Sequence, residues 1–231
     1  MKISIFGLGY VGAVSAGCLA QEGHSVIGVD PYKPKVDLIN SGNTPVIEAD
    51  IGDIVAKAVE AGTLRATTDI HDAVHNTEMS FICVGTPSLH NGALNLKYVR
   101  NVCEQIGSVI KEKDDFHVIV ARSTMLPGSM TDVVIPTLEE VSGNKAGSGF
   151  GVCNNPEFLR EGTAVYDFYN PPKTVIGETD SISGDMLASI YQKMDAPLIR
   201  TDVQTCLLYT SPSPRDFSCN LVCRLMLEKR G

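Results

Sequence analysis

The stretch that decides the fold is Met1–Asp30, which reads MKISIFGLGYVGAVSAGCLAQEGHSVIGVD. An apolar run at residues 2–6 leads into the glycine pattern of residues 7–12. An amphipathic stretch follows, and a second apolar run at residues 26–29 is closed by Asp30. Strand, glycine turn, helix, strand and acid in this order are typical of a mononucleotide-binding βαβ unit.

Each glycine of the pattern has a physical role. Gly7 allows a tight turn out of the strand, Gly9 lets a pyrophosphate approach without meeting a Cβ atom, and Gly12 lets the helix pack closely. The helix that follows offers its free N–H groups and the positive end of its dipole to phosphates. These three glycines are therefore predicted to bind a dinucleotide.

Asp30 is placed to select the cofactor. It lies about 20 residues after the glycines, where a carboxylate accepts hydrogen bonds from the adenosine ribose hydroxyls and repels a 2′-phosphate. This favours NAD over NADP, although Lys33 and Lys35 are nearby cations that could pair with such a phosphate. The alternative is a glycine-rich turn without a ligand. The flanking strand, helix and acid argue against it.

The composition is that of a soluble globular protein: 231 residues, 43% of them hydrophobic and 20% charged. The net charge of −8 argues against a nucleic-acid partner. No apolar run reaches membrane-spanning length, and Met1 leads directly into the first strand without a signal pattern. We therefore expect a cytoplasmic protein. The seven cysteines have no framework spacing, and Cys18, Cys83 and Cys103 are expected to be buried thiols.

Strands and helices are predicted to alternate along the chain, which indicates an α/β fold with a doubly wound, Rossmann-like parallel sheet covered on both faces. Ligands of such sheets bind beyond the carboxyl ends of the strands. Polar motifs follow five predicted strands, and we expect them to converge on one crevice. They are Gly7–Gly12, Asp30, Gly85–Pro87, Ser123–Thr124 and Asn155–Gly162. The predicted helices span residues 33–40, 50–61, 69–74, 96–110, 129–140 and 183–193, and Pro136 should bend or shorten the helix at 129–140.

A histidine pair offers a weaker signal. His71 and His75 lie four residues apart on a predicted helix, a spacing that can hold a metal ion. With no third ligand in view, a solvated helix face is the preferred interpretation, and no metal site is predicted.

The segment Asn155–Gly162, NPEFLREG, resembles the nucleotide-sugar 6-dehydrogenases, the family of UDP-glucose and GDP-mannose dehydrogenases. The opening GLGYVG, the VGTP at residues 84–87, and the RST and LPG motifs within residues 122–128 resemble the same family. The resemblance covers roughly residues 1–202. Within the family, Phe6–Asp30 and Pro171–Gly177 are most similar to the GDP-mannose members, which serve alginate precursor synthesis.

The resemblance implies an NAD-dependent, four-electron oxidation of a sugar C6 alcohol to a carboxylate, in two steps with two NAD. A cysteine thiolate adds to the aldehyde, the hemithioacetal loses a second hydride, and the thioester is hydrolysed. The implied cofactor contacts are Tyr10, Val11, Asp30, Lys35, Thr86 and Thr124. The implied substrate-side loop consists of Glu157, Phe158, Leu159, Arg160 and Glu161.

Two of these residues carry an implied catalytic role. Glu161 is the implied general base of thioester hydrolysis, and Thr124 the implied holder of the catalytic water. Each has a structural alternative. Thr124 could cap a strand end, and Glu161 could be a solvated carboxylate in the first turn of a helix. Glu157 could equally be structural, and we rank it below Glu161.

The sequence departs from the family after Asp202. The family's longer chain continues with a helix carrying a lysine and an asparagine, a glycine-rich loop with the cysteine nucleophile, and a second domain. We therefore predict an NAD-binding domain at residues 1–202 and a disordered or artefactual tail at 203–231, similar to vector-derived read-through. The tail is rich in serine and proline near residues 211–214, and its cysteines, Cys206, Cys219 and Cys223, are not predicted to be nucleophiles.

Three functions stay open. The first is a nucleotide-sugar 6-dehydrogenase that acts on GDP-mannose or UDP-glucose, present here as a truncated fragment. The second is a non-catalytic NAD-binding module, and the third another hydroxyacid-type NAD dehydrogenase. The Asn155–Gly162 loop argues against the third, because a shared fold alone does not supply it. The resemblance also implies a homodimer built on a central helix, which we expect to be missing from this chain.

Overall fold

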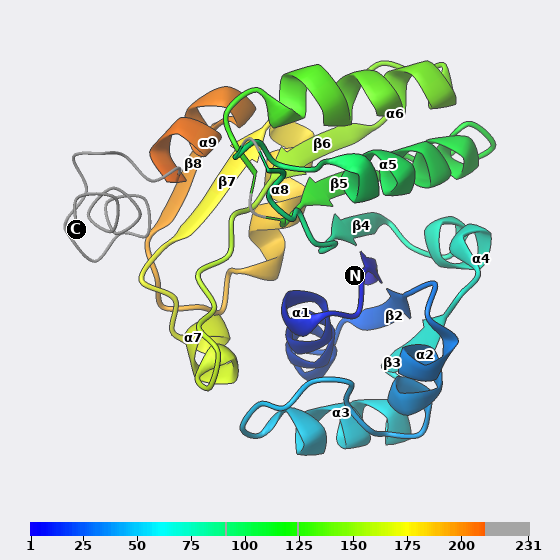
Figure 1. Cartoon of the computed structure of the whole chain (residues 1–231), viewed down its shortest axis with the longest axis vertical. Helices are drawn as coiled ribbons and strands as arrows, with labels where there is room; N and C mark the ends of the chain where they lie inside the picture. Colours follow the sequence, from blue (N-terminus) through cyan, green and yellow to red (C-terminus); the bar gives the residue numbers. More distant parts are fainter. Residues whose placement is uncertain (91, 124, 211–231) are drawn as a thin grey trace.

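The protein is described by a computed structural model that covers residues 1–90, 92–123 and 125–210. These residues form one eight-stranded sheet with helices on both faces (Figure 1). The strands are β1 Lys2–Phe6, β2 Ser25–Val29, β3 Leu64–Thr67, β4 Met79–Ile82, β5 Val118–Ala121, β6 Gly151–Asn154, β7 Thr174–Glu178 and β8 Leu198–Asp202. Their spatial order is β3-β2-β1-β4-β5-β6-β7-β8. The chain thus starts in the middle of the sheet and winds outward in both directions, which confirms the predicted doubly wound α/β fold.

The helices follow the predicted periodicity closely, with two additions. They are α1 Tyr10–Gln21, α2 Lys33–Asn40, α3 Ile51–Glu60, α4 Ile70–His75, α5 Lys97–Ile110, α6 Ile135–Ser142, α7 Ala164–Tyr169, α8 Ser181–Ile190 and α9 Val203–Thr210. The additions are α7 and α9. A π-helical turn at Met130–Val134 runs directly into α6 and places Pro136 in its first turn, where a missing N–H is tolerated. The helix predicted at residues 129–140 is therefore a π-helical turn followed by α6, which continues past Pro136 to Ser142.

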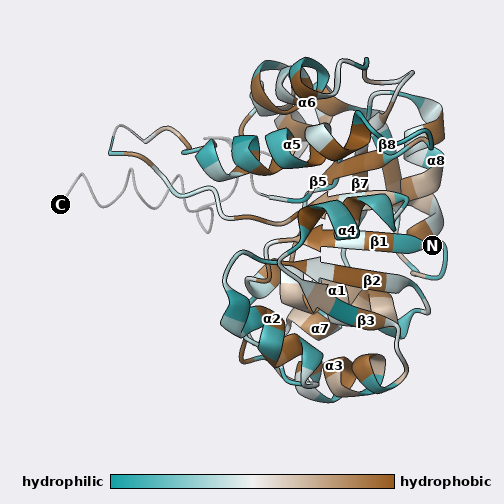
Figure 2. Cartoon of the chain, turned by 90° about the vertical axis from the view of Figure 1, so that its right-hand side faces the viewer, coloured by the Kyte–Doolittle hydropathy of each residue, from teal (hydrophilic) through white to brown (hydrophobic). Residues whose placement is uncertain are grey.

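The apolar side chains gather in two clusters, one on each face of the sheet. One cluster joins the strands to α1, α2, α3, α7 and α8, and the other joins them to α4, α5, α6 and α9. Figure 2 shows the strands mostly brown and the outward faces of α2 and α5 teal. A sheet covered on both faces needs near-continuous apolar strands, and all four residues of both β4 and β5 are buried.

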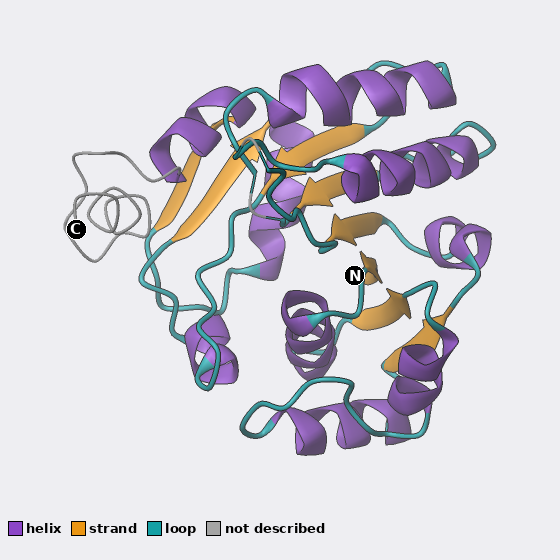
Figure 3. Cartoon of the chain, viewed as in Figure 1, coloured by secondary structure: helices purple, strands orange, loops and turns teal. Residues whose placement is uncertain are grey.

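The last two strands differ from a wholly parallel sheet. β6 and β7 pair antiparallel, whereas β7 and β8 pair parallel to each other. The reason is the connection between β6 and β7. Residues 155–173 carry α7, which packs against α1, and they return to the sheet at the edge where β6 ended (Figure 3). Helix α7 lies on this connection but does not cross the sheet from one end of the strands to the other. Residues 155–173 therefore stay beside the carboxyl ends of the parallel strands.

The start of the predicted tail is folded, so the structure differs there from the sequence analysis. Residues 203–210 form α9, and Val203, Cys206 and Leu207 are buried against the sheet. The approach is close, because a Cβ atom on Gly177 of β7 would lie 2.5 Å from that of Cys206. Residues 211–231, with Cys219 and Cys223, lie outside the described residues. None of the helices in the described ranges has the length and apolar character needed to span a bilayer.

Candidate functional site

The glycine turn between β1 and α1 has the conformation that its sequence predicts. Gly7 has a φ of +96°, which favours glycine. A Cβ atom on Gly12 would lie 1.8 Å from the carbonyl oxygen of Gly7, so only glycine lets α1 begin this close to the turn. A Cβ atom on Gly9 would meet no atom of the described chain within 4 Å. The space beside Gly9 is therefore open to a ligand.

This turn fits a dinucleotide phosphate group. Helix α1 begins at Tyr10, and its first turn carries no acidic residue. Gly9, which precedes the helix, has no side chain with which to cap the first amides. The amides and the positive end of the helix dipole therefore face the open space beside Gly9, an arrangement suited to a pyrophosphate.

Asp30, at the end of β2, is 5% exposed and holds the turn in place. Its carboxylate accepts hydrogen bonds from the backbone amides of Leu8 and Tyr32, both at 2.9 Å. The Lys35 ammonium lies 3.1 Å from the same carboxylate. Lys33 pairs with Asp37 instead, at 2.6 Å. Both lysines near the ribose position are thus engaged by carboxylates.

The ends of β4 and β5 are tied together beside the glycine turn. The Ser123 hydroxyl donates to the Val84 carbonyl at 2.6 Å. A Cβ atom on Gly7 would lie 3.0 Å from the Cys83 carbonyl oxygen, which places the end of β4 against the turn. Thr86 is half-buried in the loop after β4. Thr124 lies outside the described residues, so its implied role stays a prediction.

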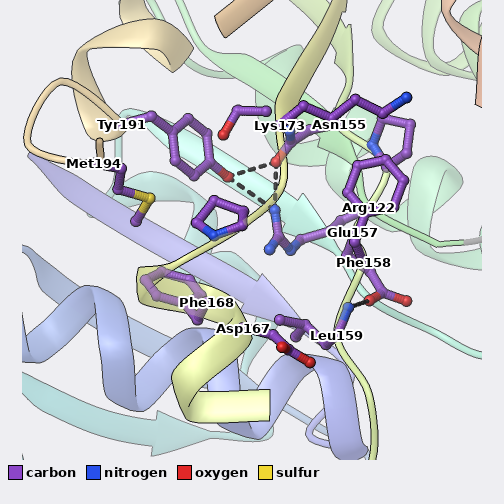
Figure 4. Close-up of a pocket in the computed structure, with 13 residues that line it drawn as sticks. Arg122, Asn155, Glu157, Phe158, Leu159, Asp167, Phe168, Lys173, Tyr191 and Met194 are labelled. Carbon is purple, nitrogen blue, oxygen red and sulfur yellow. Dashed lines mark hydrogen bonds between the residues drawn. The ribbon is translucent and has the colours of Figure 1, made fainter. Parts of the chain in front are cut away.

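A buried polar cluster joins the ends of β5 and β6. The guanidinium of Arg122, 6% exposed, donates to the side-chain oxygen of Asn155 and, at 2.8 Å, to the Tyr191 hydroxyl (Figure 4). Tyr191 in turn donates to Asn155 at 2.5 Å, and Asn155 donates to the Val175 carbonyl at 2.9 Å. Burial raises the pKa of the Tyr191 hydroxyl, which stays neutral. The cluster fixes the start of the Asn155–Gly162 loop.

The predicted substrate-side residues hold that loop in several ways. Glu157 accepts the Leu159 amide at 2.6 Å, which supports its structural interpretation (Figure 4). Arg160 forms an ion pair with Asp167 at 2.7 Å, and this partner holds the pKa of the Asp167 carboxyl at about 2. The Lys173 ammonium lies 5.7 Å from the centre of the Phe158 ring, within cation–π range.

Glu161 is exposed and precedes α7, which begins at Ala164. It therefore does not occupy the first turn of a helix, which was the alternative to its predicted catalytic role. The cavity behind the loop, lined by Arg122, Glu157 and Tyr191, has a volume of about 20 Å³. This is room for about one water molecule, so the cavity itself is too small for a larger ligand.

The loop and the glycine turn meet directly. The Tyr10 hydroxyl donates to the carboxylate of Glu48, which also accepts the backbone amides of Gly162 and Ala164. Hydrogen bonds thus link the segments that follow β1, β2, β5 and β6. The segment that follows β4 joins them through the Ser123 hydrogen bond and the contact of Cys83 with the glycine turn. The sequence analysis found neither Glu48 nor Tyr191, because each lies in a stretch without a motif.

The remaining candidates have structural surroundings. His71 and His75 stack with ring centres 5.6 Å apart, and the described ranges hold no group of three side chains that could bind a metal ion. Burial raises the pKa of the Cys18, Cys83 and Cys103 thiols to about 12. It also raises that of Cys206. These four cysteines are protonated at neutral pH. Cys18 and Cys103 are buried as predicted, whereas Cys83, at the end of β4, is only partly buried.

A doubly wound sheet whose first strand ends in an open glycine turn and whose second ends in a buried aspartate defines a dinucleotide-binding domain. The sequence model described as "UDP-glucose/GDP-mannose dehydrogenase family, NAD binding domain" matches residues 1–195. The chain belongs to this family, as its NAD-binding domain, and its cofactor is NAD.

Individual relatives agree with this assignment. The GDP-mannose 6-dehydrogenase of Pseudomonas savastanoi pv. phaseolicola is 55% identical over 203 residues, 88% of this chain and 46% of that protein. The UDP-glucose 6-dehydrogenase of Haloferax volcanii is 36% identical over 208 residues, 88% of this chain and 48% of that protein. A crystal structure of a ternary complex of GDP-mannose dehydrogenase from Pseudomonas aeruginosa superposes with a TM-score of 0.90 at 48% identity. The superposition covers 100% of this chain and 50% of the chain in that crystal structure. The chain thus spans about half the length of the relatives it matches.

Proposed function

We propose that this chain is the cofactor-binding half of a nucleotide-sugar 6-dehydrogenase that oxidises a sugar C6 alcohol to the carboxylate with NAD. The observation that carries the proposal is the direct contact between the glycine turn and the Asn155–Gly162 loop through Tyr10 and Glu48. A cofactor on the turn and a substrate on the loop are thereby brought to the same edge of the sheet.

The proposed division of labour follows the strand ends. Bound NAD supplies the hydride acceptor. The residues proposed to hold it are Gly7, Gly9, Tyr10, Val11, Gly12, Asp30, Lys35, Thr86 and Thr124. The substrate side is proposed to be Glu157–Glu161, with Glu161 as the base of thioester hydrolysis, because Glu161 is exposed on this loop. Arg160, held by Asp167, keeps the loop backbone in place.

GDP-mannose is the substrate that we propose for the whole protein. The GDP-mannose relatives are 53–55% identical to this chain, compared with 36% and 33% for the UDP-glucose relatives. The product would then be an activated uronate for a polysaccharide of the alginate type. We also propose a cytoplasmic location, since the five cysteines of residues 1–90, 92–123 and 125–210 are all free thiols. A homodimer, as in the family, stays a prediction for the whole protein.

A non-catalytic NAD-binding module is the second candidate. It is favoured by the cysteines, because burial raises the thiol pKa at all five described positions and leaves no thiolate there to attack an aldehyde.

Two measurements on the purified chain test both candidates. Calorimetric titration should show saturable NAD binding. NADH absorbance should stay flat when GDP-mannose or UDP-glucose is added with NAD. Absence of NAD binding would contradict the proposed cofactor site, and NADH formation would contradict the module interpretation of this chain.

A further inference from the structure

Glu48 lies on the segment that joins α2 to α3, far in sequence from both partners that it brings together. Its carboxylate accepts the Tyr10 hydroxyl from the start of α1. It also accepts the backbone amides of Gly162, at 2.8 Å, and Ala164, at 3.2 Å. The Gly162 amide is shared, since it lies 3.1 Å from the Tyr10 oxygen as well. One carboxylate thus joins three segments of the chain.

The protonation states of this pair are well defined. Burial and the Glu48 carboxylate raise the pKa of Tyr10 to about 12. The hydrogen bond from Tyr10 and the amides of Gly162 and Ala164 lower the pKa of Glu48. At neutral pH Tyr10 is therefore a donor and Glu48 an ionised acceptor, which is the stronger kind of hydrogen bond.

The residues that flank Glu48 alternate between packed and exposed positions. Val46 packs against the core, whereas Ile47 is 101% exposed. Asp50 has a φ of +64°, the one positive φ of a non-glycine residue in the described chain. Such a conformation costs free energy and persists where the surrounding structure requires it.

We propose that Glu48 is a positioning residue that couples the cofactor site to the Asn155–Gly162 loop, through its simultaneous contacts with Tyr10 and with the Gly162 and Ala164 amides. The inference rests on the proposed function, since it takes the glycine turn to bind NAD. Tyr10 is the first residue of α1, whose first-turn amides would hold the phosphates of NAD. A ligand that fixes this turn fixes the Tyr10 hydroxyl, and through Glu48 it fixes the start of α7. The loop is then ordered for substrate when cofactor is present.

A purely structural Glu48 would hold Gly162 and Ala164 equally with and without NAD, so the NAD-dependent change separates the two roles. The experiment is amide hydrogen exchange of the peptide that contains Gly162 and Ala164, with the full chain, free and saturated with NAD. The variants are Glu48→Gln and Tyr10→Phe. Glu60→Gln is the matched control, because Glu60 is an exposed carboxylate at the end of α3.

In the wild type and in Glu60→Gln, NAD should slow exchange of this peptide by about fivefold or more, a typical coupling between sites. The slowing should be lost in Glu48→Gln, and NAD affinity should fall by about the same factor, because coupling is reciprocal. Tyr10→Phe keeps the carboxylate on both amides. It should therefore exchange like the wild type when free and lose the NAD-dependent slowing.

The outcomes are distinct. If NAD slows exchange in Glu48→Gln and in Tyr10→Phe as much as in the wild type, or does not slow it in a wild type that binds NAD, the inference is overturned and the proposed cofactor site stands. A wild type that binds no NAD overturns both, and the flat titration identifies that case.

Discussion

Two glycines of the same turn should respond oppositely to one added methyl group. In Gly9→Ala the new Cβ meets no described atom within 4 Å, and the backbone at φ −79° and ψ −164° is extended and open to alanine. The free energy of unfolding should change by less than about 0.5 kcal/mol, or rise slightly because alanine restricts the unfolded chain. The methyl group instead occupies the space that the pyrophosphate needs, and NAD affinity should fall about tenfold or more.

In Gly12→Ala the new Cβ would lie 1.8 Å from the Gly7 carbonyl oxygen, so the turn and the helix must separate by about 1.2 Å to reach a 3.0 Å contact. Both sides of this contact are backbone and yield poorly. Overpacking of this kind costs about 1–3 kcal/mol, and we expect the upper end. Urea denaturation measures the stability of both variants, and calorimetry measures NAD binding. A Gly9→Ala variant that binds NAD like the wild type, or loses as much stability as Gly12→Ala, would refute the reasoning.

Three further changes test the surrounding structure. Asp30→Ala should weaken NAD binding and also cost about 1–3 kcal/mol of unfolding free energy, because the Leu8 amide loses its acceptor; unchanged stability by urea denaturation would argue against that second role. Tyr191→Phe should lower the free energy of unfolding by about 1–3 kcal/mol, because buried Arg122 loses a hydrogen-bond acceptor. Thermal unfolding checks this, and an unchanged unfolding temperature would contradict it. Burial lowers the pKa of His117 to about 3, so the unfolded chain binds the extra proton and stability falls as the pH drops from about 6.5 towards 3. The free energy of unfolding should be about 2 kcal/mol lower at pH 5 than at pH 7.5. Urea denaturation at the two pH values should show a smaller decrease in His117→Gln. An equal decrease in the variant would assign the effect to other groups.

The part of the site that could be predicted from sequence is the part built from local backbone. Gly7, Gly9 and Gly12 act through φ angles and close approaches that few other residues allow, so their spacing carries the information. Asp30 follows from its fixed distance after them. The apolar runs of β4 and β5 likewise identify strands covered on both faces.

The remainder depends on contacts between distant segments, which no local pattern encodes. Glu48 and Gly162 are 114 residues apart. Tyr191, which directly follows α8, and Asn155, which directly follows β6, are 36 apart. Helix α7 has only six residues, too few for a periodic signal. The reversed direction of β7 follows from where residues 155–173 return to the sheet, which alternation of strands and helices does not reveal.

The central claim is that the glycine turn and Asp30 form an NAD site within these residues. Calorimetric titration of the full chain with NAD and, separately, with NADP tests it most directly. The account predicts one saturable site for NAD and binding of NADP weaker by about tenfold or more, because the buried carboxylate repels a 2′-phosphate. Equal affinity for the two cofactors, or no binding of NAD, would contradict it.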